Sequence, residues 1–166
     1  IDIACEFDTT PLKSEVLMLA SEGSLGRVFV LRLEDGDRLP DCLEAFAAEK
    51  GVQSAFCALL GGAEQGSKVV VGPEDGAAQA ITPMIKELAG VHEAVAFGTL
   101  FPNADDQPTL HMHGSFGRGE GVTTGCVRQG VDIWRIAEVV MLELTDVGMR
   151  RVKDPAFGFE VLSSGK

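Results

Sequence analysis

Short stretches of apolar and β-branched residues recur along this chain, and glycine-rich or polar turns separate them. Residues 27–34 form the clearest stretch, which ends at Asp35-Gly36, a common turn pair, and predicts a central strand. Gly61-Gly62 follows the second long stretch and predicts a kink or bulge there. Residues 73–83 are polar and rich in glycine and alanine, so we predict a loop. The further predicted strands are 52–60, 68–71, 92–101, the stretch around His111 and His113, 122–127, 131–136 and 139–144.

One stretch follows a helical period instead. From Leu39 the apolar residues recur at intervals of three and four, while charged residues take the other side, which predicts an amphipathic helix. Asp37 is the predicted N-cap and Gly51 the predicted residue just after the helix. The apolar positions are Leu39, Cys42, Leu43, Phe46 and Ala47.

Strands that follow one another through short turns pair antiparallel. We therefore predict an α+β fold: a largely antiparallel sheet sandwich with one main amphipathic helix packed on a sheet face. The predicted organisation is an N-terminal extension over 1–25, the domain proper over 26–147, and a C-terminal tail over 148–166 that adds an edge strand near 154–162.

The composition and net charge of the chain limit the kinds of partner that it can bind. At 166 residues, 45% of them hydrophobic and 23% charged, the chain fits one globular domain. Its formal net charge of -11 disfavours phosphate backbones and anionic lipid, because binding them requires Lys and Arg to displace counterions. We expect weak DNA binding by this chain alone. No apolar run approaches the roughly 20 residues of a membrane-spanning helix, so we expect no membrane association.

The four cysteines, Cys5, Cys42, Cys57 and Cys126, are scattered without C-x-x-C spacing. Cys42 and Cys57 stand in apolar contexts, which predicts buried reduced thiols. With no cysteine-dense framework and no signal peptide pattern, we expect a cytoplasmic protein. Because the first residue is Ile1 rather than Met, we expect that the chain is trimmed upstream.

The candidate chemistry lies between residues 109 and 126. His111 and His113 are two apart in a predicted strand, so both imidazoles leave the same face. The glycine-rich segment 117–121 can turn the chain back as a hairpin. If Arg118 and Gly119 form a two-residue loop, Cys126 lies across from His111, whereas a three-residue loop moves Cys126 to the opposite face.

Two imidazoles and a thiolate form a plausible three-ligand set for zinc, and they disfavour magnesium or calcium, which prefer oxygen ligands. The alternatives are two hydrogen-bonded histidines at a subunit contact and a Cys126 that acts as a small buried hydrophobe. Glu93 either orients a ligand histidine, serves as an acid–base group beside a metal-bound water, or is a structural carboxylate. Arg32 either pairs with a carboxylate such as Glu138 or binds an anionic ligand.

In order and spacing, the features of residues 27–144 resemble the PPC (plants and prokaryotes conserved) domain. They include the first strand with Arg32 and Gly36, the helix with Phe46 and Ala47, Gly61, Gly90 with Glu93, the run Leu110-His111-Met112-His113, Gly121, Gly125, Gly130 and the run Ala137-Glu138-Val139-Val140. The family accompanies AT-hook motifs in plants and often stands alone in bacteria, where it carries a DNA-binding label.

The resemblance implies an α+β domain that forms homotrimers in bacterial members. The family pattern has a third histidine that completes a zinc-binding cluster in some members, and Cys126 occupies that position here. Three functions remain open: a metal-dependent enzyme or small-molecule binder, a DNA-associated module, and a structural trimer fastened by metal. Three protein ligands leave the fourth zinc position open, which favours the first, whereas the net charge disfavours the second. Whether the protein is an enzyme stays open.

Overall fold

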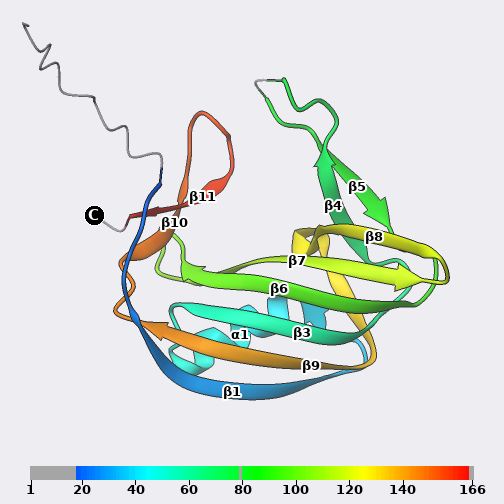
Figure 1. Cartoon of the computed structure of the whole chain (residues 1–166), viewed down its shortest axis with the longest axis horizontal. Coiled ribbons are helices and arrows are strands. Elements are labelled where there is room, and N and C mark those ends of the chain that lie inside the picture. The colour runs from blue at the N-terminus through cyan, green and yellow to red at the C-terminus, as the bar shows by residue number, and fades with distance from the viewer. Residues whose placement is uncertain (1–17, 79, 165–166) are drawn as a thin grey trace, which may run out of the picture.

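Residues 18–78 and 80–164 are described by a computed structural model, in which strands predominate (Figure 1). Strand pairing is antiparallel throughout, as predicted. The elements are β1 (Ser24–Glu34), β2 (Arg38–Leu39), α1 (Asp41–Lys50), β3 (Ala55–Ala63), β4 (Lys68–Pro73), β5 (Pro83–Glu87), β6 (His92–Pro102), β7 (Pro108–Arg118), β8 (Gly121–Cys126), the 3-10 turn η1 (Val127–Gln129), β9 (Val131–Thr145), β10 (Met149–Lys153) and β11 (Glu160–Ser164).

The strands form one nine-stranded sheet and a separate two-stranded ribbon. The order across the large sheet is β1-β9-β3-β6-β7-β8-β4-β5, with β2 also paired to β9, while β10 pairs only with β11. We expected a sandwich of sheets, but among the described residues the main strands are continuous with one another. The long strands β6, β7 and β9 each pair on both edges, which joins all their neighbours into a single sheet.

The helix α1 begins and ends close to its predicted limits. Gly51 adopts a left-handed conformation (φ 66°) directly after it, as predicted from the sequence. The prediction of Asp37 as N-cap is wrong, because Pro40 occupies that position and no side chain caps the helix. Asp37 instead closes the preceding turn, where its carboxylate accepts a hydrogen bond of 2.8 Å from the backbone N–H of Glu34.

Alternate residues of each strand give the sheet two different faces. The inner face is buried together with Leu43 and Ala47 of α1, which Figure 1 shows behind β3 and β9. Its central members are Cys57, Leu59, Ala96, Leu100, Met112, Phe116, Val139 and Met141. The outer face exposes a group of large apolar side chains that we call the outer apolar face: Val28, Val30, Phe56, Leu60, Val95, Phe97, Val122, Ile136 and Val140.

The predicted irregularity at Gly61-Gly62 is confirmed. The register between β3 and β9 shifts at this point, because Gly61 pairs with Ala137 while Gly62 pairs with Trp134. Arg135 in the bulge has a φ of 65°, which interrupts the apolar alternation there. The sequence predicts two strands, 131–136 and 139–144, but in the structure they are the single strand β9, which continues through this bulge.

The ends of the domain differ most from expectation. The strands β5 and β10 were not predicted, and the expected edge strand near 154–162 is β11, which pairs with β10 and not with the large sheet. The predicted N-terminal extension over 1–25 contains the start of β1, while its residues 1–17, including Cys5, lie outside the described part. No helix among the described residues is long and apolar enough to cross a membrane.

Candidate metal centre

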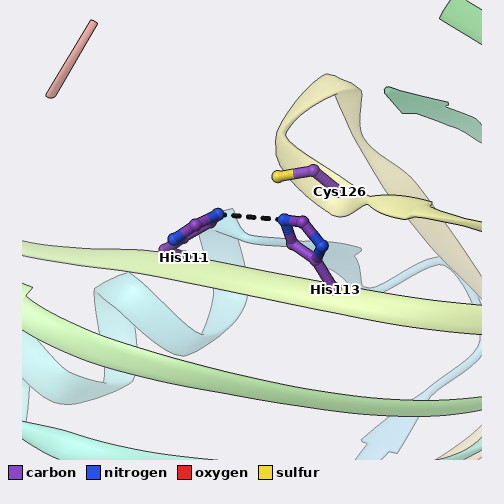
Figure 2. A group of neighbouring side chains, drawn as sticks. All are labelled: His111, His113 and Cys126. Carbon is purple, nitrogen blue, oxygen red and sulfur yellow. Dashed lines mark hydrogen bonds between the residues drawn. The ribbon is translucent and has the colours of Figure 1, made fainter. Parts of the chain in front are cut away.

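The central strand β7 carries both candidate histidines on the outer face. Because side chains alternate, Met112 between them points into the core and is fully buried, whereas His111 and His113 are exposed. Their Nε2 atoms lie 3.0 Å apart, at hydrogen-bonding distance (Figure 2). The alternation of side chains along the strand therefore places both rings on one side of the sheet, as predicted from the sequence.

The hairpin between β7 and β8 brings Cys126 to the same place. Arg118 pairs with Gly121, so the two-residue loop is Gly119-Glu120 and not the predicted Arg118-Gly119. This moves every cross-strand partner by two positions, and Cys126 lies across from His113 instead of His111. A shift of two preserves the face, so the predicted juxtaposition is present although its register was wrong.

The ligand atoms of His111, His113 and Cys126 lie within 4.8 Å of one another. Figure 2 shows the sulfur of Cys126 directed toward the two facing ring nitrogens. A tetrahedral zinc ion with bonds of roughly 2.0–2.3 Å keeps its ligand atoms about 3.3–3.7 Å apart. Rotamer adjustments on the order of an ångström therefore suffice to close this group around an ion, and the donor set of two imidazoles and one thiolate suits zinc.

The environment keeps both imidazoles neutral, which is the form that binds metal. His111 is exposed as a residue but its ring is half-buried, and this partial burial lowers the pKa of His111, which the positive charges of Arg151 and Arg128 lower further. Burial also lowers the pKa of His113, with additional contributions from His111 and Arg128. At neutral pH both rings are therefore unprotonated, the form that is able to bind a metal.

A pocket of about 200 Å³ opens beside the cluster. Arg128 stands at its wall, and its Nε donates to the sulfur of Cys126 over 3.3 Å. Arg151 of β10 is only 5% exposed, and it lines the pocket together with Phe159 and Glu160 near the start of β11. No local sequence pattern marks these pocket residues, because only the fold places the ribbon of β10 and β11 against the cluster.

The other two candidate site residues lie away from the cluster. Glu93 is on the outer face, but it pairs with Gly117, four residues along β6 from Phe97, which pairs with His113. Four residues of strand span about 13 Å, so the structure does not bring Glu93 to the histidines. It lines a different pocket, of about 420 Å³, with Leu60 and Val95 among its walls.

Arg32 is exposed on β1 near the far edge of the sheet. It lies across from Glu138, the partner suggested by the sequence, but its Nε donates to the carboxylate of Glu34 over 2.8 Å. This surface ion pair satisfies Arg32 locally, and its strand is separated from β7 by β9, β3 and β6.

The third histidine, His92, and two further cysteines are buried or partly buried. His92 is buried, and its Nδ1 lies 2.8 Å from the carbonyl oxygen of Gly90. Cys57 is a buried free thiol, as predicted, and burial raises its pKa to about 12. Cys42 is free and partly buried, and burial is again the main reason that its pKa is raised to about 11.

Comparisons with known proteins give the family and the fold of this chain. Residues 20–145 match the family model of the Plants and Prokaryotes Conserved (PCC) domain. A metal-containing protein from Archaeoglobus fulgidus is 26% identical with a TM-score of 0.75, covering 89% of this chain and 100% of that one. A plant- and prokaryote-conserved protein from Pyrococcus horikoshii is 24% identical with a TM-score of 0.73, covering 90% and 99%.

A third solved structure carries a different description. It is a candidate DNA-binding protein from Ralstonia eutropha, 20% identical with a TM-score of 0.62, covering 81% of this chain and 89% of that one. At this identity the likeness shows the fold alone. No curated protein matches the sequence.

Proposed function

Since the chain belongs to the Plants and Prokaryotes Conserved domain family, we propose that it is a metal-dependent small-molecule-binding domain of this family. In this proposal His111, His113 and Cys126 bind one zinc or similar divalent ion. The observation that carries it is the convergence of three ligand atoms within 4.8 Å, next to a pocket. The metal content of the Archaeoglobus fulgidus protein, 26% identical to this chain, supports the same reading.

The number of protein ligands favours a site that binds a substrate or small molecule over a purely structural metal site. Structural zinc sites are closed by four protein ligands, whereas three ligands leave one position for water or substrate. When bound, zinc polarises a ligand oxygen or lowers the pKa of a bound water. The pocket beside the cluster supports the binding of a small molecule directly. Catalysis on that molecule is a further claim of the proposal. Glu93 has no place in it, because it lies away from the cluster.

Metal content tests the proposal. Purified wild-type protein, measured by elemental analysis and native mass spectrometry, is expected to carry one divalent ion per chain. His111→Ala removes one ligand and is expected to lose the ion. Met112→Leu is the matched control, because this side chain is in the same strand but points into the core. A volume-conserving core substitution of this kind costs about 1.5 kcal/mol or less, so the control is expected to fold and keep the ion.

Two results contradict the proposal. One is wild-type protein that binds no divalent ion even after incubation with zinc. The other is a His111→Ala variant that keeps its ion as tightly as the Met112→Leu control, since the ion is then held elsewhere in the chain.

DNA binding is the alternative function, and the description of the Ralstonia eutropha protein supports it for that protein. Here the net charge of -11 opposes it, because each phosphate contact forms against a repulsive field. We expect weak or absent binding to duplex DNA at physiological salt. Sub-micromolar binding that weakens steeply with salt, measured by fluorescence anisotropy, favours the DNA-associated module instead.

We further propose that the chain assembles as a homotrimer through the outer apolar face. Monomeric proteins rarely leave contiguous apolar patches of this kind in water, so a partner surface is the simplest cover for it. On this face the rings of Phe56 and Phe97 stack with centroids 6.1 Å apart, and Phe97 pairs across the strands with His113. The apolar face therefore extends to the edge of the metal cluster.

A further inference from the structure

The pocket beside the metal cluster has an unusual charge for this protein. The chain has 25 acidic and 14 basic residues, yet two of the arginines, Arg128 and Arg151, line this one small pocket. Its acidic lining residue is Glu160, which is exposed. The negative charge of Glu44 also favours the charged form of Arg151. However, burial raises the pKa of Glu44, and the carboxylate of Glu44 already accepts a hydrogen bond of 2.8 Å from the backbone N–H of Leu110.

Arg151 is held in place by the sheet and still has donor capacity. Its Nε donates to the carbonyl oxygen of Thr109 over 3.1 Å, and its Nη2 donates to the carbonyl oxygen of Thr99 over 2.9 Å. Within the described part of the chain, no acceptor is found for Nη1. Although Arg151 is only 5% exposed, its Nη1 is not a fully buried donor, so this spare N–H reaches the open space of the pocket, where the oxygen of a ligand can accept it.

Arg128 supplies the second donor group. Its Nε is engaged by the sulfur of Cys126, whereas its two terminal nitrogens have no acceptor among the described residues. The guanidinium therefore touches a metal-ligand atom on one side and has free N–H groups on the other. Planar forks of N–H donors match carboxylates and other oxyanions with two parallel hydrogen bonds.

The other walls favour a ligand with a hydrocarbon part. Leu110 and Phe159 line the same pocket, and its volume of about 200 Å³ is below the roughly 300–1,000 Å³ of pockets that take drug-sized molecules. A dianionic phosphate is less suited to a site that also contains the carboxylate of Glu160. A small monocarboxylate has one negative charge for the arginines and an apolar body for these two walls.

We propose that this pocket binds a small carboxylate, whose oxygens pair with Arg128 and Arg151 next to the metal held by His111, His113 and Cys126. The inference rests on the proposed metal site and specifies its ligand class. It also assigns a role to the ribbon of β10 and β11. Arg151, Phe159 and Glu160 belong to it or its loop and follow the end of the family match at residue 145.

The test uses the full chain loaded with Co²⁺, because the visible absorption of cobalt responds to changes around the ion. Butyrate is the probe carboxylate, and inorganic phosphate and chloride are compared at equal ionic strength. We expect butyrate to change the cobalt bands in a saturable way, with phosphate clearly weaker and chloride without effect. The dissociation constant for butyrate is then compared among variants.

Arg128→Met removes the exposed guanidinium without disturbing the core, and it is expected to weaken butyrate binding by about tenfold or more. Arg32→Met is the matched control, because this arginine lies on a distant strand, and it is expected to leave the affinity unchanged. Elemental analysis must show that both variants keep their cobalt. Because Arg151 is buried, Arg151→Met is informative only together with a thermal unfolding curve that shows a folded protein.

Each contrary outcome has its own meaning. Cobalt-loaded wild type that does not respond to butyrate, or an Arg128→Met variant with unchanged affinity, overturns the carboxylate pocket and leaves the metal site standing. Phosphate that binds as tightly as butyrate overturns the ligand class. Failure of the wild type to bind cobalt or zinc at all contradicts the metal site itself, and the carboxylate proposal with it.

Discussion

The two faces of the sheet use the same strands for different purposes. Leu59 and Leu60 are neighbours in β3, yet Leu59 is 4% exposed in the core and Leu60 is 58% exposed on the outer apolar face. In β7 the fully buried Met112 separates the exposed His111 and His113 in the same way. The inner face completes its contacts within one chain, whereas the outer face leaves large apolar side chains and the two histidines exposed to water.

This difference separates what stabilises the fold from what is available for function. Removing apolar surface from water contributes roughly 25 cal/mol per Å², and the inner face realises this gain together with α1. The outer face can realise it only with a partner. The candidate metal cluster lies where this open face meets the pocket, and because His111 and His113 are exposed there, replacing either histidine removes no residue of the buried core.

The largest expected effect is a difference in the free energy of unfolding between variants of the two neighbouring leucines. Leu59→Ala creates a cavity in the core and is expected to lower the free energy of unfolding by about 2–5 kcal/mol at any protein concentration. Leu60→Ala is expected to leave the free energy of unfolding of the single chain within about 0.5 kcal/mol, because the side chain is exposed there. Urea unfolding at several protein concentrations measures both. Equal losses at low concentration contradict the distinction between the faces.

The next effect concerns assembly. Phe97→Glu places a charge on the outer apolar face, and burying an unpaired charge between subunits is strongly unfavourable. Light scattering is expected to give a mass near three times 17.6 kDa for wild type and near 17.6 kDa for the variant. Ala48→Glu, on the exposed side of α1, is the control that keeps the larger mass. A monomeric wild type at micromolar concentration contradicts the trimer.

The smallest effect is the pH dependence of the metal-free protein. Because the folded state lowers the pKa of His111 and His113 below their ordinary value of 6.5, the unfolded chain takes up protons first as the pH falls. The free energy of unfolding is therefore expected to decrease as the pH falls below about 6.5, and to be insensitive to these groups above it. Urea unfolding at pH values on both sides of 6.5, in the presence of a chelator, measures this.

The matched variant for the pH experiment replaces both histidines with asparagine. It is expected to lose the part of the slope that these two groups cause, while other titrating groups keep theirs. A slope that is unchanged in the double variant means that the histidines are not held in the neutral form by their surroundings.

Much of the fold was predictable because strand period and turn chemistry are local. The alternation around Met112 predicts the face of each histidine, and the glycine after α1 is where the helix ends. The errors come from features that local pattern does not contain. The two-residue hairpin loop lies one position later than predicted, and the predicted break between residues 136 and 139 is absent, because β9 continues through a bulge at Arg135. The helix N-cap was misassigned because Asp37 closes a turn instead.

By itself, the sequence determined that this chain is an acidic, strand-rich domain of the Plants and Prokaryotes Conserved family, with two histidines on one strand face. These properties follow from composition, from the period of two, and from the order of motifs along the chain. The tertiary structure decided the rest: that Cys126 meets the histidines, and that Arg128 and Arg151 close a pocket beside them. The physical reason is that cross-strand register and the docking of β10 and β11 depend on contacts between residues far apart in the chain, which no local pattern records.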